Sequence, residues 1–131
     1  MRSHGKLVLD TCALLWLATG GGKLSPLAKA AVDDAEVVLV SAISLWEIGL
    51  KQSEGQLELP LSPKEWFQRA LEVHGLTVAS LSLDILSGAN ELPWHHRDPA
   101  DRFIIATAIQ EQCPVVTADA HFEQYGIDIL C

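Results

Sequence analysis

The segment KLVLDTCALLWLAT, residues 6–19, decides the fold class because its periodicity changes at an aspartate. Residues 6–10 form a short apolar run that ends in Asp10, a pattern typical of a strand buried on both faces of a parallel sheet. From Thr11 onward the apolar residues recur at helical spacing, and three glycines at residues 20–22 then end the helix. A buried strand followed directly by a helix indicates an α/β protein.

The rest of the chain repeats this alternation of strands and helices. Serine or aspartate before proline caps a helix and predicts its start; the three instances are Ser25-Pro26, Ser62-Pro63 and Asp98-Pro99. The sequence Ser44-Leu-Trp-Glu47 matches a capping box and predicts a further helix start. Later strands are expected at residues 37–40, 76–81, 115–117 and 128–130, and later helices at residues 25–34, 44–55, 62–74, 84–91 and 98–112.

Strands that alternate with helices pair in parallel through right-handed crossovers. We therefore expect an α/β three-layer α/β/α sandwich with a short, mainly parallel central sheet. The chain has 131 residues, 49% of them hydrophobic and 20% charged, which is enough for one globular domain and too little for two.

The sequence predicts a cytoplasmic protein with no membrane segment. Its longest nearly apolar stretch, residues 37–46, is too short to cross a bilayer. Asp10 interrupts the only N-terminal run that resembles a signal peptide. The cysteines are odd in number and lack metal-type spacing, which fits a reducing compartment; they are Cys12, Cys113 and Cys131.

The net charge of −8, from 17 acidic and 9 basic side chains, argues at first against a nucleic-acid ligand. The objection weakens if several acids share one metal site, because bound divalent ions reverse the local sign of charge. The sequence offers five such acids.

These five acids map to one edge of the expected sheet. Asp10 and Asp119 follow the first and fourth strands, Glu47 lies in the first turn after the second strand, and Asp98 and Asp101 begin the helix before the fourth. Ligands of parallel sheets bind beyond the carboxyl ends of the strands. Carboxylates about 4 Å apart repel by roughly 4 kcal/mol at an effective dielectric of 20, so gathering them requires cations. Oxygen-only ligands favour Mg²⁺ or Mn²⁺.

Each acid also has a structural explanation. Asp98 and Asp10 can be N-caps, and Glu47 can be the capping-box partner of Ser44. Asp101 and Asp119 can lie favourably near helix N-termini. For one residue alone the capping explanation is the stronger, whereas the convergence of five favours a metal site. A cysteine hydrolase using Cys12 also stays open, although nothing in the sequence pairs this thiol with a histidine.

Four segments in this order resemble a PIN domain, specifically a VapC-type toxin ribonuclease of a type II toxin–antitoxin system. They are LVLDT (residues 7–11), SLWE (44–47), DPADRFIIATA (98–108) and TADAHF (117–122). The resemblance covers residues 6 to about 130. It implies a single PIN-like nuclease domain over residues 1–131, in which we expect residues 1–5 to be a leader that is partly vector-derived.

The resemblance implies specific roles. The catalytic metal-binding acids would be Asp10, Glu47, Asp101 and Asp119, with Asp98 as a further candidate ligand. Thr11, Ser44 and Thr117 would support them. The family hydrolyses RNA phosphodiesters with Mg²⁺ or Mn²⁺, commonly forms homodimers, and is silenced by a VapB-type antitoxin protein.

The nearest basic candidates for RNA contact are Arg97, Arg102 and Lys51, although basic residues beside acids are usually ordinary surface charges. The four tryptophans are expected as core or interface anchors. The alternative function is a catalytically inactive PIN-like module that binds RNA or a protein partner. The presence of all four family acids favours activity.

Overall fold

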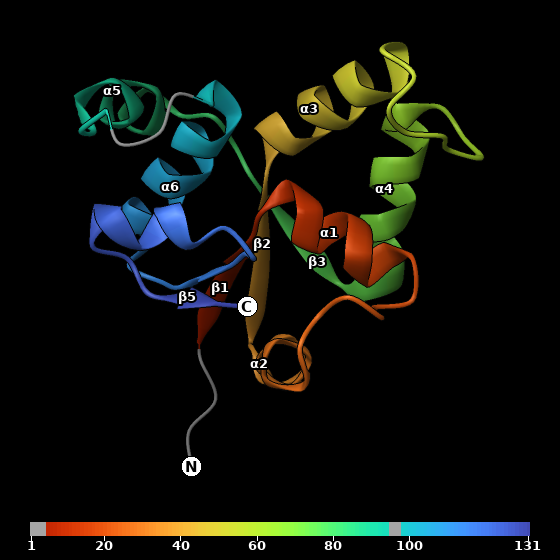
Figure 1. Cartoon of the computed structure of the whole chain (residues 1–131), viewed down its shortest axis with the longest axis horizontal. Coiled ribbons are helices and arrows are strands. Elements are labelled where there is room, and N and C mark those ends of the chain that lie inside the picture. Colours follow the sequence, from red (N-terminus) through yellow and green to blue (C-terminus); the bar gives the residue numbers. More distant parts are fainter. Residues whose placement is uncertain (1–4, 95–97) are drawn as a thin grey trace.

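The computed structural model describes residues 5–94 and 98–131 (Figure 1). Its strands form one sheet in the order β3-β2-β1-β4-β5, and every pairing in it is parallel. The strands are β1 (Lys6–Leu9), β2 (Val37–Ser41), β3 (Leu76–Ala79), β4 (Val115–Val116) and β5 (Ile129–Leu130). The predicted mainly parallel sheet is confirmed.

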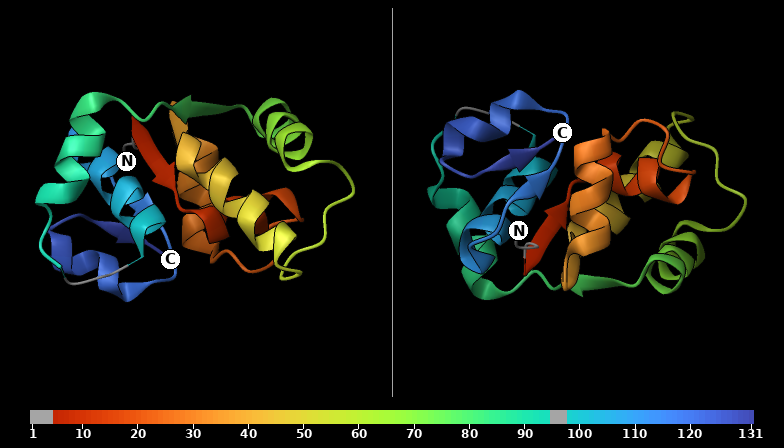
Figure 2. Two further views of the ribbon diagram at one scale, coloured as in Figure 1. Left: turned by 90° about the horizontal axis from the view of Figure 1, so that it is seen from above. Right: turned by 90° about the horizontal axis from the view of Figure 1, so that it is seen from below.

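Helices cover both faces of this sheet. They are α1 (Thr11–Ala18), α2 (Pro26–Asp34), α3 (Ala42–Ser53), α4 (Pro63–His74), α5 (Leu83–Glu91), α6 (Pro99–Glu111) and the 3-10 helix η1 (Ala120–Tyr125). Seen from above, α5, α6 and η1 lie on one side of β1, and α3 and α4 lie on the other (Figure 2). The three-layer sandwich is therefore confirmed. None of the helices in the described part of the chain combines the length and the apolar character needed to cross a bilayer.

Three of the predicted helix starts are confirmed by their caps. The side chain of Ser25 accepts a hydrogen bond from the backbone of Ala28, and Ser62 accepts one from Glu65. The Asp98 carboxylate accepts from the backbone N–H groups at the start of α6. These caps satisfy N–H groups that have no partner within their helices.

The capping box predicted at Ser44 and Glu47 is wrong. Helix α3 begins earlier, at Ala42, and its N-cap is Ser41, whose Oγ accepts a hydrogen bond of 3.2 Å from the backbone of Ile43. Residues three apart in a helix lie on the same face, so Ser44 and Glu47 can also contact one common side chain. In this structure both contact Thr11.

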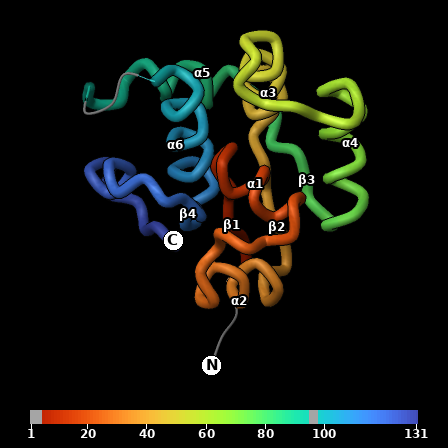
Figure 3. The backbone as a smooth tube through the Cα atoms, turned by 45° about the vertical axis from the view of Figure 1, so that its right-hand side comes forward, coloured from red at the N-terminus to blue at the C-terminus, as the bar shows by residue number. Residues whose placement is uncertain are grey.

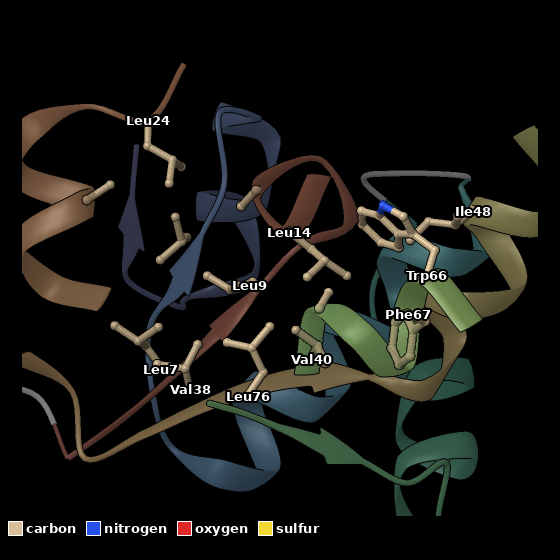
Figure 4. Packing of buried hydrophobic residues seen from close by; sticks show 14 residues of the cluster. Leu7, Leu9, Leu14, Leu24, Val38, Val40, Ile48, Trp66, Phe67 and Leu76 are labelled. Atoms are coloured by element: carbon tan, nitrogen blue, oxygen red, sulfur yellow. The ribbon is translucent and has the colours of Figure 1, made fainter. Parts of the chain in front are cut away.

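Alternate residues of each strand pack against opposite helical layers. Leu7 and Leu9 of β1 join a core with Leu14 and Trp66 (Figure 4). Val8 packs on the other face of the sheet, with a cluster that includes Phe122. Full burial of such a side chain contributes about 1.5–3 kcal/mol to stability. The two cores pack against both faces of the strands and so position the residues at their carboxyl ends.

Only part of the tryptophan prediction is confirmed. Trp66 is a core residue, 9% exposed, but Trp46 is 57% and Trp94 is 68% exposed.

The backbone trace shows α2 beneath the sheet, at the end opposite α3 (Figure 3). The edge near α3 is the one on which the predicted site residues lie.

Candidate active site

The candidate site lies where the strands end and two helices begin. Asp10 follows β1 directly, and Thr117 follows β4. Because β1 and β4 are parallel neighbours, these two residues occupy the same edge of the sheet. Helix α3 starts from the end of β2 at this edge, and α6 starts at the same upper end of the molecule (Figure 1).

Three carboxylates from two helices converge here. Glu47 of α3 and Asp98 and Asp101 of α6 each offer one oxygen, and these oxygens lie within 4.8 Å of one another. All three residues are half-buried. Among the described residues, this close group contains neither Asp10 nor Asp119. The donors are oxygens only, the set that hard divalent cations prefer.

Asp10 lies deeper, at 7% exposure, and is linked electrostatically to the other acids. Burial raises the pKa of its carboxyl above the ordinary value, and the charges of Glu47 and Asp119 raise it further. Hydrogen bonds from the Thr117 side chain and from the backbone of Ala13, the latter 2.7 Å long, act in the opposite direction. Asp10, Glu47 and Asp119 therefore share one electrostatic environment.

A buried pair of hydroxyls supports Glu47. Oγ1 of Thr11 donates to Oε1 of Glu47 over 2.5 Å and lies 2.9 Å from Oγ of Ser44. Thr11 is 3% exposed and Ser44 is fully buried. The structure thus places two of the three predicted supporting residues directly behind a predicted ligand.

The third supporting residue, Thr117, orients Asp119. Its Oγ1 accepts a hydrogen bond of 3.0 Å from the backbone N–H of Asp119. The Asp119 carboxylate in turn accepts from the backbone of His121 and lies 2.8 Å from its ring Nδ1. Sequence reasoning missed both His121 and η1. The only available signal was the histidine two residues after an acid in TADAHF, because side chains behind metal ligands are often paired in this way.

Three of the acids are also helix caps, two of them, Asp10 and Asp98, as the structural explanation predicted. Asp10, Asp98 and Asp119 are the N-caps of α1, α6 and η1. In each case the oxygen that accepts from the helix backbone is Oδ1. A carboxylate offers about four acceptor positions on two oxygens, so capping a helix and binding a cation are compatible.

The basic residues predicted to contact RNA differ in burial and in position. Lys51 is half-buried and lies one helical turn beyond Glu47 on α3. Arg102 is only 4% exposed, and its guanidinium donates to backbone carbonyls of the protein itself. Its prediction as an RNA contact is therefore corrected to a structural role. Arg97, like most of the predicted leader, lies outside the described residues.

The cysteine alternative loses support. Burial and the charge of Asp10 raise the pKa of the Cys12 thiol above its ordinary value, whereas Lys51 acts to lower it. A raised pKa reduces the fraction of thiolate, which is the nucleophilic form. Cys12, Cys113 and Cys131 are all free thiols.

Comparison with known proteins identifies the family. Residues 7–128 match the family model of the PIN domain. The chain belongs to the PIN-domain family. This PIN domain is also 30% identical, over 120 residues, to Ribonuclease VapC22 of Mycobacterium tuberculosis, and the match covers 91% of each chain.

Solved structures with lower sequence identity share the fold of this PIN domain. DNA-bound VapBC from Salmonella typhimurium matches with a TM-score of 0.68 and 17% identity, over 98% of this chain and 97% of that one. FitAcB from Neisseria gonorrhoeae matches with a TM-score of 0.66 and 19% identity, over 95% and 96% of the two chains.

Proposed function

We propose that this PIN domain is a metal-dependent ribonuclease that hydrolyses RNA phosphodiester bonds. Asp10, Glu47, Asp101 and Asp119 would hold Mg²⁺ or Mn²⁺, with Asp98 as a further ligand. The observation that carries the proposal is the convergence of the Glu47, Asp98 and Asp101 oxygens within 4.8 Å, beside the buried Asp10. The 30% identical relative named as a ribonuclease supports the same reaction.

The donor set fits a hard divalent cation. Each proposed ligand is a carboxylate, and acids this close repel one another unless a cation lies between them. When bound, such an ion lowers the pKa of water, which supplies a nucleophile, and offsets negative charge on the attacked phosphate.

The chain's own residues prepare the site for this ion. The hydroxyl of Thr11 fixes the orientation of Glu47, and Thr117 fixes both Asp10 and the backbone of Asp119. Lys51, one turn from Glu47, would contact an RNA phosphate and attract the substrate to an otherwise acidic edge. Arg97 remains a second candidate for phosphate contact.

The proposed biological role is that of the toxin in a toxin–antitoxin pair. The solved neighbours include a toxin–antitoxin complex from Klebsiella pneumoniae, at 21% identity and a TM-score of 0.59. We propose a VapB-type antitoxin as partner, and the net charge of −8 supports a partner with a basic segment.

We also propose a homodimer. Trp46 and Leu50 lie on one face of α3, are 57% and 39% exposed, and offer apolar surface for it. The free cysteines support a cytoplasmic location.

One pair of assays separates the ribonuclease from the inactive binding module. Purified protein is incubated with Mn²⁺ and with RNA and DNA oligonucleotides of one sequence, and both binding and cleavage are measured. We expect the protein to cleave the RNA oligonucleotide and to leave the DNA oligonucleotide intact. Binding of RNA without any cleavage would instead support the alternative.

The toxin role is tested in cells. Expression of the wild-type protein alone should arrest growth, whereas Asp10→Asn should not, and co-expression of a neighbouring small gene should rescue growth. Harmless expression of soluble protein that is active in vitro would contradict the toxin role and leave the ribonuclease activity standing.

A further inference from the structure

Arg102 is a charged residue in an unusual place. It is 4% exposed and lies next to Asp101 in α6. Burying a guanidinium costs several kcal/mol unless its N–H groups are satisfied by hydrogen bonds. Its contacts therefore have to be strong and well oriented.

The guanidinium is held at the end of α5. Nη1 donates to the carbonyl of Pro93 over 2.9 Å, and Nη2 donates to those of Ala89 and Leu92 over 2.6 and 2.9 Å. The last carbonyls of a helix lack partners within it and carry partial negative charge, so a cation there is favourable. The Cζ atom of the guanidinium lies over the Trp94 ring, 3.6 Å from its centroid, in a cation–π contact.

These contacts restrain the start of α6. Successive residues of an α-helix are rotated by about 100°, so fixing the direction of Arg102 also fixes the direction of Asp101, its neighbour. Asp98 caps the same helical turn. The two carboxylates from this turn meet Glu47, which comes from a different helix, so their convergence depends on how the first turn of α6 is rotated.

We propose that Arg102 is a positioning residue: anchored to the end of α5 and stacked on Trp94, it sets the first turn of α6 so that Asp98 and Asp101 converge with Glu47 on a divalent cation. This inference rests on the proposed metal-dependent function. In this proposal α5 anchors Arg102, although α5 supplies none of the five acids. Mg²⁺ requires near-octahedral oxygen ligands at about 2.0–2.1 Å, so a small rotation of the turn weakens binding.

The test measures Mn²⁺ affinity directly, by electron paramagnetic resonance of free Mn²⁺, and needs no RNA. The variants are Arg102→Lys, which keeps the charge but loses the planar fork, and Arg102→Met, which loses both. The matched control is Leu24→Ala, which removes a buried side chain from a core cluster that contains no residue of α5 or α6. All are measured well below their melting temperatures.

We expect both Arg102 variants to bind Mn²⁺ about 10- to 100-fold more weakly than the wild type, as is usual when a residue behind metal ligands is lost. Leu24→Ala should bind Mn²⁺ like the wild type even if it melts earlier. Equal affinities for the Arg102 variants and the wild type would overturn the inference. So would an equal loss of affinity in the control, because Arg102 would then act only through stability.

A second variant covers the case in which Arg102 variants do not fold. Trp94 is 68% exposed, so Trp94→Ala removes the stacking without opening the core. A weakened Mn²⁺ affinity in this folded variant supports the inference, and an unchanged affinity overturns it. If the wild type binds Mn²⁺ but does not cleave RNA, the proposed ribonuclease fails while the positioning role of Arg102 stands.

Discussion

The hydroxyl of Thr11 donates a hydrogen bond of 2.5 Å to Oε1 of Glu47, a residue 36 positions later in the chain. This contact joins the first turn of α1 to the second turn of α3. It fixes the carboxylate that the α3 side contributes to the acidic group, while Ser44 holds the same hydroxyl from behind. The contact therefore has a testable role in both stability and activity.

Replacing Thr11 by valine should lower both the stability of the fold and its affinity for metal. The variant keeps the shape of the side chain but removes a buried hydroxyl, which leaves Ser44 without this partner and typically costs about 1–3 kcal/mol. Loss of the orienting hydrogen bond should reduce metal affinity by about 10- to 100-fold. Thermal melts and Mn²⁺ titrations measure the two effects. Thr11→Ser, which keeps the hydroxyl, is the control and should stay near the wild type.

Asp98 and Asp101, at the start of α6, should have different roles, one mainly in stability and the other in RNA cleavage. Asp98 caps the helix, whereas Asp101 is its third residue. Asp98→Ala should lower stability by about 1 kcal/mol, as lost caps do, yet retain measurable RNA cleavage. Asp98→Asn, which preserves a cap, should restore the stability. Asp101→Asn should abolish cleavage with little change in melting temperature. A stable but inactive Asp98→Asn would show that the two roles have been assigned the wrong way round.

Ionised Asp10 should destabilise the metal-free fold at neutral pH. Its pKa is raised on folding, chiefly by burial, so the folded state binds this proton more tightly than the unfolded state does. The resulting stability is present in acid and is lost as the pH rises through the folded pKa. In chelator at pH 7, Asp10→Asn should therefore melt above the wild type, and the difference should shrink in acidic buffer. A variant that melts below the wild type by the same margin at both pH values would contradict this assignment.

Divalent metal should stabilise the wild type. A cation at ten times its dissociation constant contributes about 1.4 kcal/mol if the unfolded chain does not bind it. The physical cause is relief of the repulsion among Glu47, Asp98 and Asp101. Melting curves with millimolar Mn²⁺ should shift upward, and the shift should be much smaller in Asp101→Asn. Indifference of the wild type to the metal would indicate that these acids are caps and little else.

Local sequence signals predicted most of the fold because they act within a few residues. The run that ends at Asp10 and the cap-plus-proline pairs at Ser25, Ser62 and Asp98 each determine their own element. The parallel order of the sheet then brings the acids to one edge. The short helix η1 carries no comparable signal, since its six residues make too few turns to show a period.

The contacts that depend on tertiary structure could not be predicted. Ser44 and Glu47 have the spacing of a capping box, and only the position of Thr11 shows that they meet a common partner instead. Arg102 follows Asp101 directly and looks like a surface charge, but it is buried, and its guanidinium donates to carbonyls up to 13 positions away. In both cases the deciding contact comes from a different element of the fold.

The most direct test of the central claim is the rate of RNA cleavage as a function of free Mn²⁺ concentration, for the wild type and Asp10→Asn. The substitution retains an acceptor for the backbone of Ala13 at the start of α1, so the variant should stay folded. We expect no cleavage in chelator, a saturable return of cleavage as Mn²⁺ is added, and no return in Asp10→Asn. Undiminished cleavage in chelator, or cleavage by Asp10→Asn at the wild-type rate, would contradict the claim.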